Sequence, residues 1–420
     1  MGFLTLSSDN PNFSFAIKKN PETGMQIKKC RRGFMYGWYS DPCSYNIYFR
    51  EGLNSVSFKR DKHEDFEYIN TTRFSSPLFV IQAISEFFRH NTREIVSEDT
   101  EGTNTVNINM ISVNVPLYLK FFSEQFDNLE VSHAELGPKN FSVTMKSAGT
   151  LHRVLNLAQL FAFFVILSNR DYIELNNDIV TKYMECLNAL TPPYFMTYLF
   201  KKNCLRSRGA FDKEKAVLEQ NPLYDSMTLK FGGTLQNRID AILERTCLDE
   251  SILDIGCGEG NYIREFSKRN KEVRYIAVDT DEETLERAKK VIRNRNLENV
   301  LVSSNLDIVI ATGIPENTEV LLTEVIEHMS EQEAQELVNK ILGLKNVKSL
   351  LITTPNFEFN RFYPMDTKFR HDDHKFEFTQ EQWRVFMEQF ERYGEVEYFN
   401  IGDEVNGIPT SLGAKITRKV

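Results

Sequence analysis

The chain has 420 residues, of which 41% are hydrophobic and 26% charged, and its 32 phenylalanines supply ample core material. This composition is typical of a soluble globular protein, and the length exceeds what one ordinary core holds, so we expect two domains. The formal net charge of −9 excludes a broad basic surface for nucleic acid, although it leaves room for a protein that holds the end of one strand.

The cysteines and the apolar runs indicate in which cellular compartment the protein is found. The six cysteines are scattered without a Cys-x-x-Cys pair, and the sequence opens without a signal-peptide pattern. We therefore expect reduced thiols and a cytoplasmic protein. The most apolar run covers residues 160–167, far short of the roughly 20 residues that a membrane-spanning helix needs, so no contact with a membrane is expected.

Residues 1–200 mix strand and helix patterns and are expected to form an α+β domain. Alternating apolar and polar residues predict a β-hairpin between 46–49 and 55–59. Ser76 is expected to cap a buried helix that begins with a proline, and a second long helix is expected over 152–168. The apolar residues at helical spacing are interpreted as core, and no catalytic pattern is found in this half.

Residues 201–233 are polar and charged and end in Phe231-Gly232-Gly233. We expect a partly helical linker that ends the first domain. It includes a basic cluster that either contacts phosphate or forms a solvated face. The cluster comprises Lys201, Lys202, Arg206 and Arg208.

Residues 234–420 alternate helix and strand patterns, which imply a parallel α/β sheet covered by helices on both faces. Helices are expected at 235–245, 261–269 and 281–293. Ligands of such sheets bind beyond the carboxyl ends of the strands. The strands are expected at 252–255, 273–278, 300–303, 320–324 and 350–354.

The first of these strands runs into a glycine-rich turn with Gly256, Gly258 and Gly260. Their missing Cβ atoms let the backbone bend sharply and let a ligand approach it closely. Asp254 precedes the turn, and Asp279 closes the next strand, where a carboxylate can accept hydrogen bonds from both hydroxyls of a ribose. The alternative is a tight turn beside a solvent-facing aspartate.

Two cofactors compete for this turn, a nicotinamide dinucleotide and S-adenosylmethionine. Dinucleotide enzymes need a glycine or alanine at the third position of G-x-G-x-x-G, and that position here is Asn261. The run Asp-Ile-Gly-Cys-Gly-Glu-Gly resembles motif I of the Rossmann-like methyltransferases, in which the acidic residue faces the amino acid part of the donor. The sequence therefore favours the methyl donor. Ser303 and Asn305 end the third strand and are candidates for the adenine pocket.

Residues 319–378 contain three of the chain's seven histidines beside paired carboxylates, a composition typical of a metal site. Glu324, Glu327 and His328 stand at i, i+3 and i+4, so they would share one face of a helical turn. On another helix this pattern is often only a solvated charged face. Here it follows an apolar strand, where open α/β sheets bind their ligands, and His374 could supply a fourth ligand from the next loop.

The types of ligand residue limit which metal ions the site would bind. Two imidazoles with two carboxylates favour Mn²⁺, Fe²⁺, Co²⁺ or Zn²⁺, and we expect Mn²⁺ before the others, with Mg²⁺ less favoured because it prefers oxygen and retained water. His371 either supports a ligand, contacts the substrate or lies at the surface as a bystander.

Three motifs at 323–329, 353–360 and 370–379 carry a family resemblance. T-E-V-I-E-H-M, T-T-P-N-F-E-F-N and R-H-D-D-H-K-F-E-F-T together resemble the small-RNA 3′-terminal ribose 2′-O-methyltransferases. The resemblance implies a Rossmann-like class I methyltransferase domain at 234–420 that methylates the 2′ hydroxyl at an RNA 3′ end. It also implies that the metal ligands and catalytic residues are Glu324, Glu327, His328 and His374.

The implied chemistry predicts end selectivity. Only a terminal ribose offers vicinal 2′ and 3′ hydroxyls to an ion that acidifies the 2′ hydroxyl. RNA with a 3′ phosphate or a 3′ deoxy end is therefore predicted to be a poor substrate.

The first half resembles the bacterial members of that family, which act in RNA repair beside a polynucleotide kinase-phosphatase and a ligase. The resemblance rests on Asn-Pro near the start, a glycine-rich stretch before Tyr39, and T-R-F-S-S-P-L-F-V at 72–80. It implies that residues 1–200 form an interaction domain for such repair enzymes.

Three residues depart from the family pattern. Phe378 stands where a Trp is usual, Gln380 where an Arg is common, and Asn261 where an Arg is expected after the glycine turn. RNA contacts could therefore differ while the metal ligands stay intact. Two other functions remain open: a metal-dependent phosphoesterase that uses the same Glu/His cluster, and a non-catalytic scaffold for an RNA repair ligase.

Overall fold

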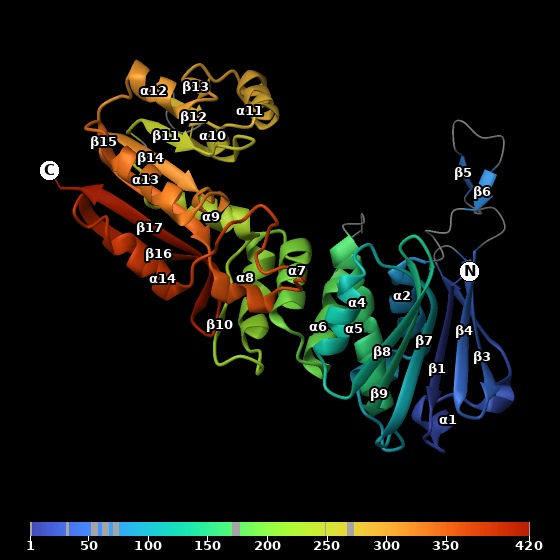
Figure 1. The fold of residues 1–420 in the computed structure, drawn as a ribbon. Coiled ribbons are helices and arrows are strands. Elements are labelled where there is room, and N and C mark those ends of the chain that lie inside the picture. The colour runs from blue at the N-terminus through green and yellow to red at the C-terminus, as the bar shows by residue number, and fades with distance from the viewer. Residues whose placement is uncertain are drawn as a thin grey trace. The chain divides into compact units, whose positions relative to one another are not determined.

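The structure, a computed structural model, describes residues 2–30, 33–51, 58–60, 67–69, 75–169, 177–247, 249–266 and 273–419. The chain divides into two units, Met1–Arg206 and Ser207–Val420 (Figure 1). The expected linker at 201–233 is shared between them. Its first residues end helix α7 (Tyr194–Cys204) of the first unit, and its later residues form helix α8 (Arg208–Glu219) of the second.

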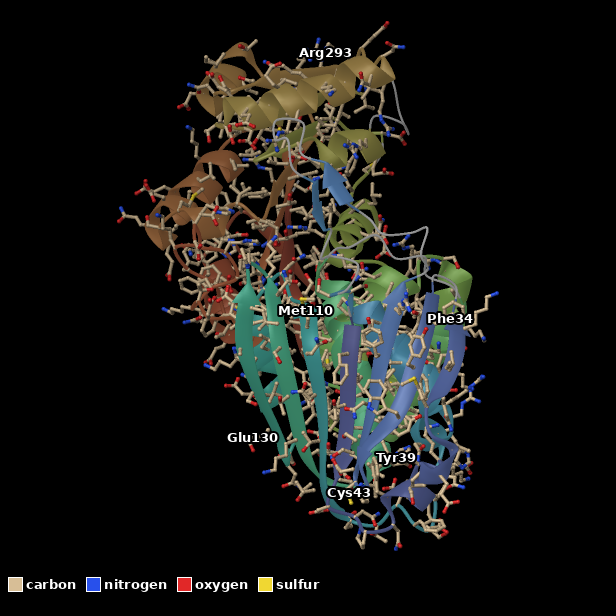
Figure 2. All side chains as sticks on the ribbon, turned by 90° about the vertical axis from the view of Figure 1, so that its right-hand side faces the viewer. Phe34, Tyr39, Cys43, Met110, Glu130 and Arg293 are labelled. Carbon is tan, nitrogen blue, oxygen red and sulfur yellow. The ribbon has the colours of Figure 1, made fainter. Side chains whose placement is uncertain are left out.

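The first unit is built on a seven-stranded sheet in which every pair of neighbouring strands is antiparallel. Burial alternates along β1, so one face of the sheet is covered and the other is wetter. Figure 2 shows these strands side by side, from β3 with Phe34 to β8 with Glu130. In sheet order the strands are β2 (Gln26–Cys30), β3 (Gly33–Asp41), β4 (Ser44–Glu51), β1 (Gly2–Ser8), β7 (Gly102–Ser112), β9 (Asn140–Gly149) and β8 (Leu129–Gly137).

Helices α2 and α5 pack against each other and against this sheet. Helix α2 (Pro77–Phe87) begins after Ser76 with a proline at its first position, and α5 covers Leu151–Asn169, so both predicted helices are confirmed. Ser76 occupies the capping position, but its side chain makes no capping hydrogen bond. The stretch Leu151–Ser168 is long and apolar enough to cross a membrane by length and composition alone, but 83% of it is buried in the unit, as in a core helix. The other helices of this unit are α1 (Phe13–Ala16), η1 (Pro21–Thr23), α3 (Arg89–Arg93), α4 (Leu117–Glu124) and α6 (Asn177–Ala189).

The hairpin predicted between 46–49 and 55–59 is wrong. Strand β4 instead pairs with β1 and β3. Strand β5 (Phe58–Arg60) pairs with β6 (Glu67–Ile69) in a separate two-stranded sheet. The expected turn lies outside the described residues. Residues 46–49 do form a strand, but its partners are β3, which comes directly before it, and β1 at the start of the chain.

The second unit has an eight-stranded mixed sheet in the order β10-β16-β17-β15-β14-β11-β12-β13. The five expected strands form its parallel part, which confirms the Rossmann-like prediction, whereas β10, β16 and β17 run antiparallel and were not predicted. The strands are β10 (Met227–Thr228), β11 (Ile252–Ile255), β12 (Tyr275–Val278), β13 (Val300–Ser303), β14 (Thr318–Thr323), β15 (Val347–Pro355), β16 (Gly394–Val405) and β17 (Ile408–Arg418).

Helices cover both faces of this sheet. A separate hydrophobic cluster lies on each face. One cluster includes Val338 and Trp383, and the other includes Ile239 and Leu285. The helices of the unit not yet placed are α9 (Thr234–Leu243), α10 (Asn261–Phe266), α11 (Glu282–Arg295), α12 (Leu306–Thr312), η3 (Ile326–His328), α13 (Glu331–Leu342), η4 (Phe357–Phe362) and α14 (Gln380–Glu388).

Strands β11 and β14 are neighbours, although two other strands separate them in the sequence. The chain runs from β11 outward to β12 and β13 on one side, then returns to place β14 on the other side. This reversal is a topological switch point, where the loops at the carboxyl ends diverge and leave room for a ligand. The loops after β11 and β14 therefore begin side by side.

The opposite end of the sheet provides a test of stability. The buried carboxylate of Glu319 accepts hydrogen bonds from the Cys247 N–H at 2.6 Å, the Ser349 hydroxyl at 3.0 Å and the Lys415 ammonium at 3.0 Å. Glu319→Gln should lower the free energy of unfolding of the second unit by about 3–5 kcal/mol, because it leaves a mostly buried ammonium without its counter-charge.

The matched control is Glu250→Gln, which breaks the more exposed ion pair with Lys348 at 2.9 Å and should cost less than about 1 kcal/mol. The chain has two tryptophans, and in a Trp38→Phe background the buried Trp383 reports urea unfolding of the second unit. Equal losses in the two variants would contradict the importance of the buried pair.

Candidate active site

The first part of the candidate site is the glycine turn after β11. Gly256, Gly258 and Gly260 have φ angles of 74°, 55° and 79°, a region that residues with a Cβ atom rarely adopt. The Gly256 N–H donates to the Val278 carbonyl at 2.8 Å, which ties the turn to β12. A Cβ atom on Gly258 would meet no atom within 4 Å, so a ligand can approach the backbone there.

Asp279, the expected ribose carboxylate, is held against this turn. One of its oxygens accepts the Gly258 N–H at 2.8 Å, and the other accepts the Asp281 N–H at 3.0 Å. Each carboxylate oxygen has a second acceptor position. Both oxygens therefore remain able to accept a ribose hydroxyl while the backbone fixes their orientation.

Asp254 lies fully buried in β11 beneath the turn. The Tyr275 hydroxyl donates to its Oδ2 at 2.6 Å, while Oδ1 has no hydrogen-bond partner among the described residues. Burial raises the pKa of this carboxyl to about 7, the Tyr275 bond opposes the rise, and the charge of Asp279 adds to it. An unpaired buried carboxylate oxygen is a suitable partner for an ammonium group.

Ser303, the remaining expected cofactor residue, ends β13 and is bonded to Asn305. Its hydroxyl donates to the Asn305 carbonyl at 3.0 Å and accepts the Asn305 N–H at 3.2 Å. The Asn305 side chain in turn accepts the N–H groups of Asp307 and Ile308 at the start of α12. Both side chains therefore shape the loop at the carboxyl end of the third strand.

The second part of the site is the turn after β14. This strand is buried along its whole length, and Glu324 leaves it with a φ of 53°, which is uncommon for a residue with a side chain. A single 3₁₀ turn follows over Ile326–His328. Because the chain reverses at Glu324, the helical face on which Glu324, Glu327 and His328 were expected to align does not form.

The two turns touch. A Cβ atom built on Gly256 would lie 2.3 Å from Cγ2 of Val325, the residue between Glu324 and the 3₁₀ turn. Only glycine lets the Val325 side chain pack so close to the backbone of the first turn. The turn that suits a nucleotide ligand is therefore packed directly on the turn that carries the carboxylates and the histidine.

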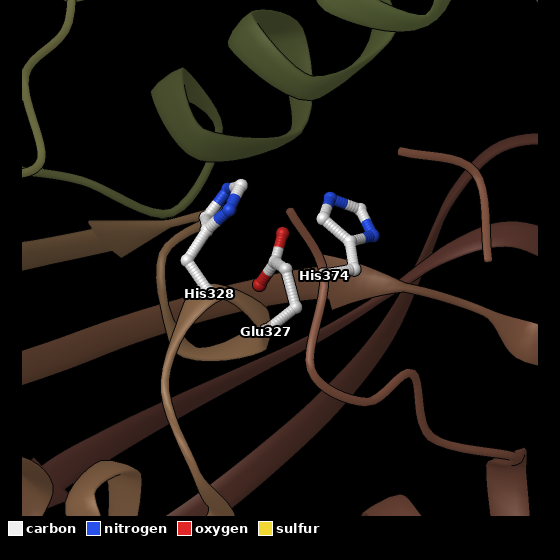
Figure 3. Close-up of side chains that lie close together, drawn as sticks. All are labelled: Glu327, His328 and His374. Atoms are coloured by element: carbon white, nitrogen blue, oxygen red, sulfur yellow. The ribbon is translucent and has the colours of Figure 1, made fainter. Parts of the chain in front are cut away.

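Three of the four expected metal ligands lie together. Glu327, His328 and His374 each offer a ligand atom, and these atoms all lie within 4.8 Å of one another. Figure 3 shows the Glu327 carboxylate between the two rings. The loop that carries His374 is joined to the 3₁₀ turn by a hydrogen bond from the Lys375 N–H to the Glu327 carbonyl at 2.7 Å. One carboxylate and two imidazoles suit a first-row transition ion.

Glu327 has the greatest need of a positive charge. Its side chain is fully buried, and its Oε2 accepts the Thr354 hydroxyl at 3.3 Å, while its Oε1 has no hydrogen-bond partner among the described residues. Burial raises the pKa of its carboxyl to about 8, although the nearby charge of Arg238 lowers it in part. Such a carboxylate is costly unless a cation pairs with it, so these residues fit a metal ion.

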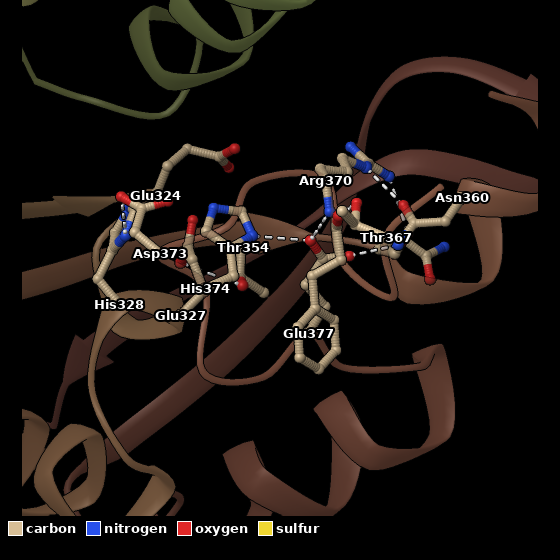
Figure 4. A network of polar contacts seen from close by, with 12 residues as sticks. Glu324, Glu327, His328, Thr354, Asn360, Thr367, Arg370, Asp373, His374 and Glu377 are labelled. Atoms are coloured by element: carbon tan, nitrogen blue, oxygen red, sulfur yellow. Dashed lines mark hydrogen bonds and ion pairs between the residues drawn. The ribbon is translucent and has the colours of Figure 1, made fainter. Parts of the chain in front are cut away.

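Both histidines contact a carboxylate through Nδ1 (Figure 4). His328 Nδ1 lies 3.1 Å from Oδ2 of the exposed Asp373, and His374 Nδ1 lies 2.7 Å from Oε1 of the buried Glu377. This arrangement leaves Nε2 of each ring for a ligand role. Burial lowers the pKa of His328, partly offset by Asp373, and a neutral ring is the form that binds metals.

Glu324, the fourth expected ligand, lies outside the cluster. Its Oε2 pairs with the Arg238 guanidinium at 2.9 Å, and its Oε1 accepts the Thr353 hydroxyl at 3.1 Å. His371 is exposed, with its ring 5.1 Å from that of His374 and its carbonyl accepting the His374 N–H at 3.3 Å. The structure thus places His371 beside a ligand and gives Glu324 an arginine as its partner.

Three residues of the site were not predicted from the sequence: Arg238, Thr354 and Glu377. Arg238 lies on α9, far from the motifs, and no local signal connects it to Glu324. Glu377 could have been found, because it stands at i+3 from His374 within the same motif. Burial of Glu377 acts to raise its pKa, but hydrogen bonds from His374, the Arg370 N–H and Asn360 outweigh that effect, so its pKa is lowered and it stays an acceptor.

Two family models match the chain. The model of the Hen1 N-terminal domain covers residues 3–222, more than half of the chain, and a methyltransferase domain model covers 252–344. The second match begins at strand β11 and ends just after α13, so it includes both turns of the candidate site.

Individual relatives agree with these matches. The small RNA 2′-O-methyltransferase of Arabidopsis thaliana is 31% identical over 176 residues, which is 36% of this chain and 19% of that protein. That of Drosophila melanogaster is 28% identical, over 41% of this chain and 46% of that protein. The chain thus spans less than half of these relatives.

One similar chain has been solved in the Pnkp1/Rnl/Hen1 RNA repair complex. It is 26% identical, with a TM-score of 0.80, and the match covers 99% of this chain and 100% of that one. A second structure of the Pnkp1/Rnl/Hen1 complex matches over the same extents with a TM-score of 0.77. Both units of the fold are therefore found together in a known protein.

Asp254→Asn tests the electrostatics of the glycine turn. The pKa of Asp254 rises from an ordinary 3.8 to about 7 in the fold. The contribution of this carboxyl to wild-type stability is therefore fully present below about pH 4 and is lost as the pH rises through 7, by up to about 4 kcal/mol. Asparagine still accepts from Tyr275 but does not ionise. Relative to wild type, the variant should gain unfolding free energy between about pH 5 and pH 8.

The measurement is urea unfolding followed by Trp383 fluorescence in the Trp38→Phe background, at both pH values. The exposed Glu395, replaced in Glu395→Gln, serves as the control and should show no such change with pH. A difference between Asp254→Asn and wild type that is the same at both pH values would contradict a raised pKa at Asp254.

Proposed function

Since this chain belongs to the Hen1 family, we propose that it transfers the methyl group of S-adenosylmethionine to the 2′ hydroxyl of the 3′-terminal ribose of RNA, with a divalent metal ion. The observation that carries this proposal is the contact between Gly256 and Val325. It joins a turn suited to a nucleotide donor to a cluster suited to a metal ion, on adjacent strands of one sheet.

We assign donor binding to the glycine turn and the two aspartates. The open space at Gly258 admits the donor close to the backbone, and the fixed oxygens of Asp279 would accept the hydroxyls of its ribose. The unpaired Oδ1 of Asp254 would accept the donor's ammonium group. Ser303 would line the far side of the pocket at the end of the third strand.

Glu327, His328 and His374 would hold the metal ion, with Mn²⁺ as the first choice because the set mixes nitrogen and oxygen ligands. Such an ion supplies a Lewis acid that lowers the pKa of a bound hydroxyl. Glu324 would complete the set after leaving Arg238. The protein's own residues then act mainly by position, since methyl transfer needs the acceptor oxygen in line with the sulfonium methyl group.

We further propose that the first unit binds an RNA repair enzyme of the kinase-phosphatase or ligase type. The support is that the similar solved chain is part of the Pnkp1/Rnl/Hen1 RNA repair complex and matches this chain over both units. The methylated end would then mark or protect RNA during repair.

The proposal predicts which RNA ends are methylated. Short RNAs with a 3′ hydroxyl, a 3′ phosphate or a 3′ deoxy end are incubated with methyl-labelled donor and either Mn²⁺ or a chelator. Label should enter only the 3′-hydroxyl RNA, and only with Mn²⁺, because the other ends lack the pair of vicinal hydroxyls.

Equal labelling of all three ends would sink the model in which both hydroxyls are bound. Release of phosphate without label would indicate a phosphoesterase. Binding of RNA without either reaction would indicate a scaffold.

Glu327→Ala should lower the rate of methyl transfer by more than about 100-fold, since it removes a buried ligand and not merely a supporting partner. Binding of S-adenosylmethionine, measured by calorimetry, should be largely unchanged, because Glu327 lies in the second turn and not in the glycine turn. Glu331→Gln, an exposed carboxylate on the next helix, is the control and should keep full activity. Loss of donor binding in Glu327→Ala would contradict this assignment.

A further inference from the structure

A continuous chain of hydrogen bonds leads from Arg370 to His374 (Figure 4). The Arg370 Nε lies 2.7 Å from Oδ1 of Asn360, the Asn360 Nδ2 lies 2.6 Å from Oε2 of Glu377, and Oε1 of Glu377 lies 2.7 Å from the His374 Nδ1. The Arg370 N–H also donates to Oε1 of Glu377 at 2.8 Å. The first three bonds join side chains and the fourth comes from the main chain of Arg370, and all of these residues belong to the second unit.

Arg370, the first residue in this series of hydrogen bonds, determines which group donates and which accepts in each of them. A guanidinium group can only donate hydrogen bonds, so the Asn360 atom that faces Arg370 must be the carbonyl oxygen. The amide nitrogen of Asn360 therefore faces Glu377 and donates to it. Arg370 itself cannot turn away easily, because its terminal nitrogen also donates to the carbonyls of Asn356 at 2.8 Å and Thr410 at 2.7 Å.

Glu377 determines the direction of the hydrogen bond with His374. Both of its oxygens already accept a hydrogen bond, from the Asn360 amide and from the Arg370 N–H, so Glu377 is held as a carboxylate without a proton to give. Its side chain is 0% exposed and that of His374 is 3% exposed, so water has little access to the bond between them. The neutral His374 ring must therefore donate from Nδ1.

We infer that Arg370 is a positioning residue that fixes His374 in the tautomer with its proton on Nδ1, so that Nε2 presents its lone pair to the ligand cluster. This inference rests on the proposed metal-dependent function. It gives the half-buried Arg370 and the buried Asn360 and Glu377 a shared role, because a ligand nitrogen that carried a proton could not bind an ion.

The first test needs no variant. In the wild-type protein without metal, the ¹⁵N chemical shifts of the histidine rings distinguish a protonated from an unprotonated ring nitrogen, and the signals of His374 are identified by their loss in His374→Gln. The neutral ring should show its proton on Nδ1. A neutral ring with its proton on Nε2 would overturn the inference, whatever the activity of the protein.

The second test compares Arg370→Lys with Arg361→Lys, an exposed arginine of the same region whose Nε donates only to the Glu358 carbonyl in the described contacts. Lysine lacks the planar fork that meets Asn360 and two carbonyls at once. Arg370→Lys should show mixed tautomers at His374 and bind Mn²⁺ about 10–100-fold more weakly by calorimetry. Arg361→Lys should match wild type in both.

The outcomes separate this inference from the proposed function. If wild type binds Mn²⁺ and methylates RNA, but Arg370→Lys keeps the single tautomer and the wild-type affinity, only the inference fails. If wild type neither binds Mn²⁺ nor methylates RNA, the proposed function fails, while the tautomer measurement on the wild-type protein still decides the role of the hydrogen-bond chain. Trp383 fluorescence checks that the variant is folded.

Discussion

The buried carboxylate of Glu327 is the constraint on which the candidate site depends. A carboxylate taken out of water without a full set of partners is expensive, and the fold keeps Glu327 there with one oxygen unpartnered among the described residues. Around it, β14 is buried along its length, and the loop that carries His374 is bonded to the Glu327 carbonyl. The packing therefore holds Glu327 in a place where its ionised form needs a nearby positive charge, and this is typical of a site that binds a cation.

The topology of the sheet places the Glu327 carboxylate beside the glycine turn proposed to bind the methyl donor. Strands β11 and β14 are far apart in the sequence but adjacent in the sheet, in register from Ile252 with Glu319 to Ile255 with Leu322. Because both end at the same level, the turns that follow them meet, and Gly256 is the residue that lets them touch. A larger residue there would push Val325 and with it the first residues of the ligand turn. One glycine thus serves two functions, the bend of the donor turn and the spacing between donor and acceptor sites.

The sequence predicted the parallel strands and the glycine turn, but it missed strand partners in both units. The parallel strands, the glycine turn and Asp279 follow from short patterns, and the structure places them at one edge of the sheet. The hairpin at 46–59 was wrong because an alternating pattern does not specify the partner strand. Strands β16 and β17 were missed although Asn406 and Gly407 join them in a two-residue hairpin turn. Glu324 shows a third limit, since helical spacing assumed a helix where the backbone turns through a left-handed residue.

The pairing of Glu324 with Arg238 sets the charge balance of the site. Glu324 is bonded through both oxygens, to Arg238 and to Thr353, and the same guanidinium lowers the pKa of Glu327 from nearby. One positive charge is thus shared between two carboxylates, and the buried Nε of Arg238 has no hydrogen-bond partner among the described residues. A single positive charge cannot neutralise two carboxylates, and Oε1 of Glu327 remains without a hydrogen-bond partner among the described residues. A divalent cation beside Glu327 would supply the missing positive charge. Arg238 therefore neutralises only part of the negative charge of the two carboxylates. The remaining negative charge lies at Glu327, where the two histidines converge.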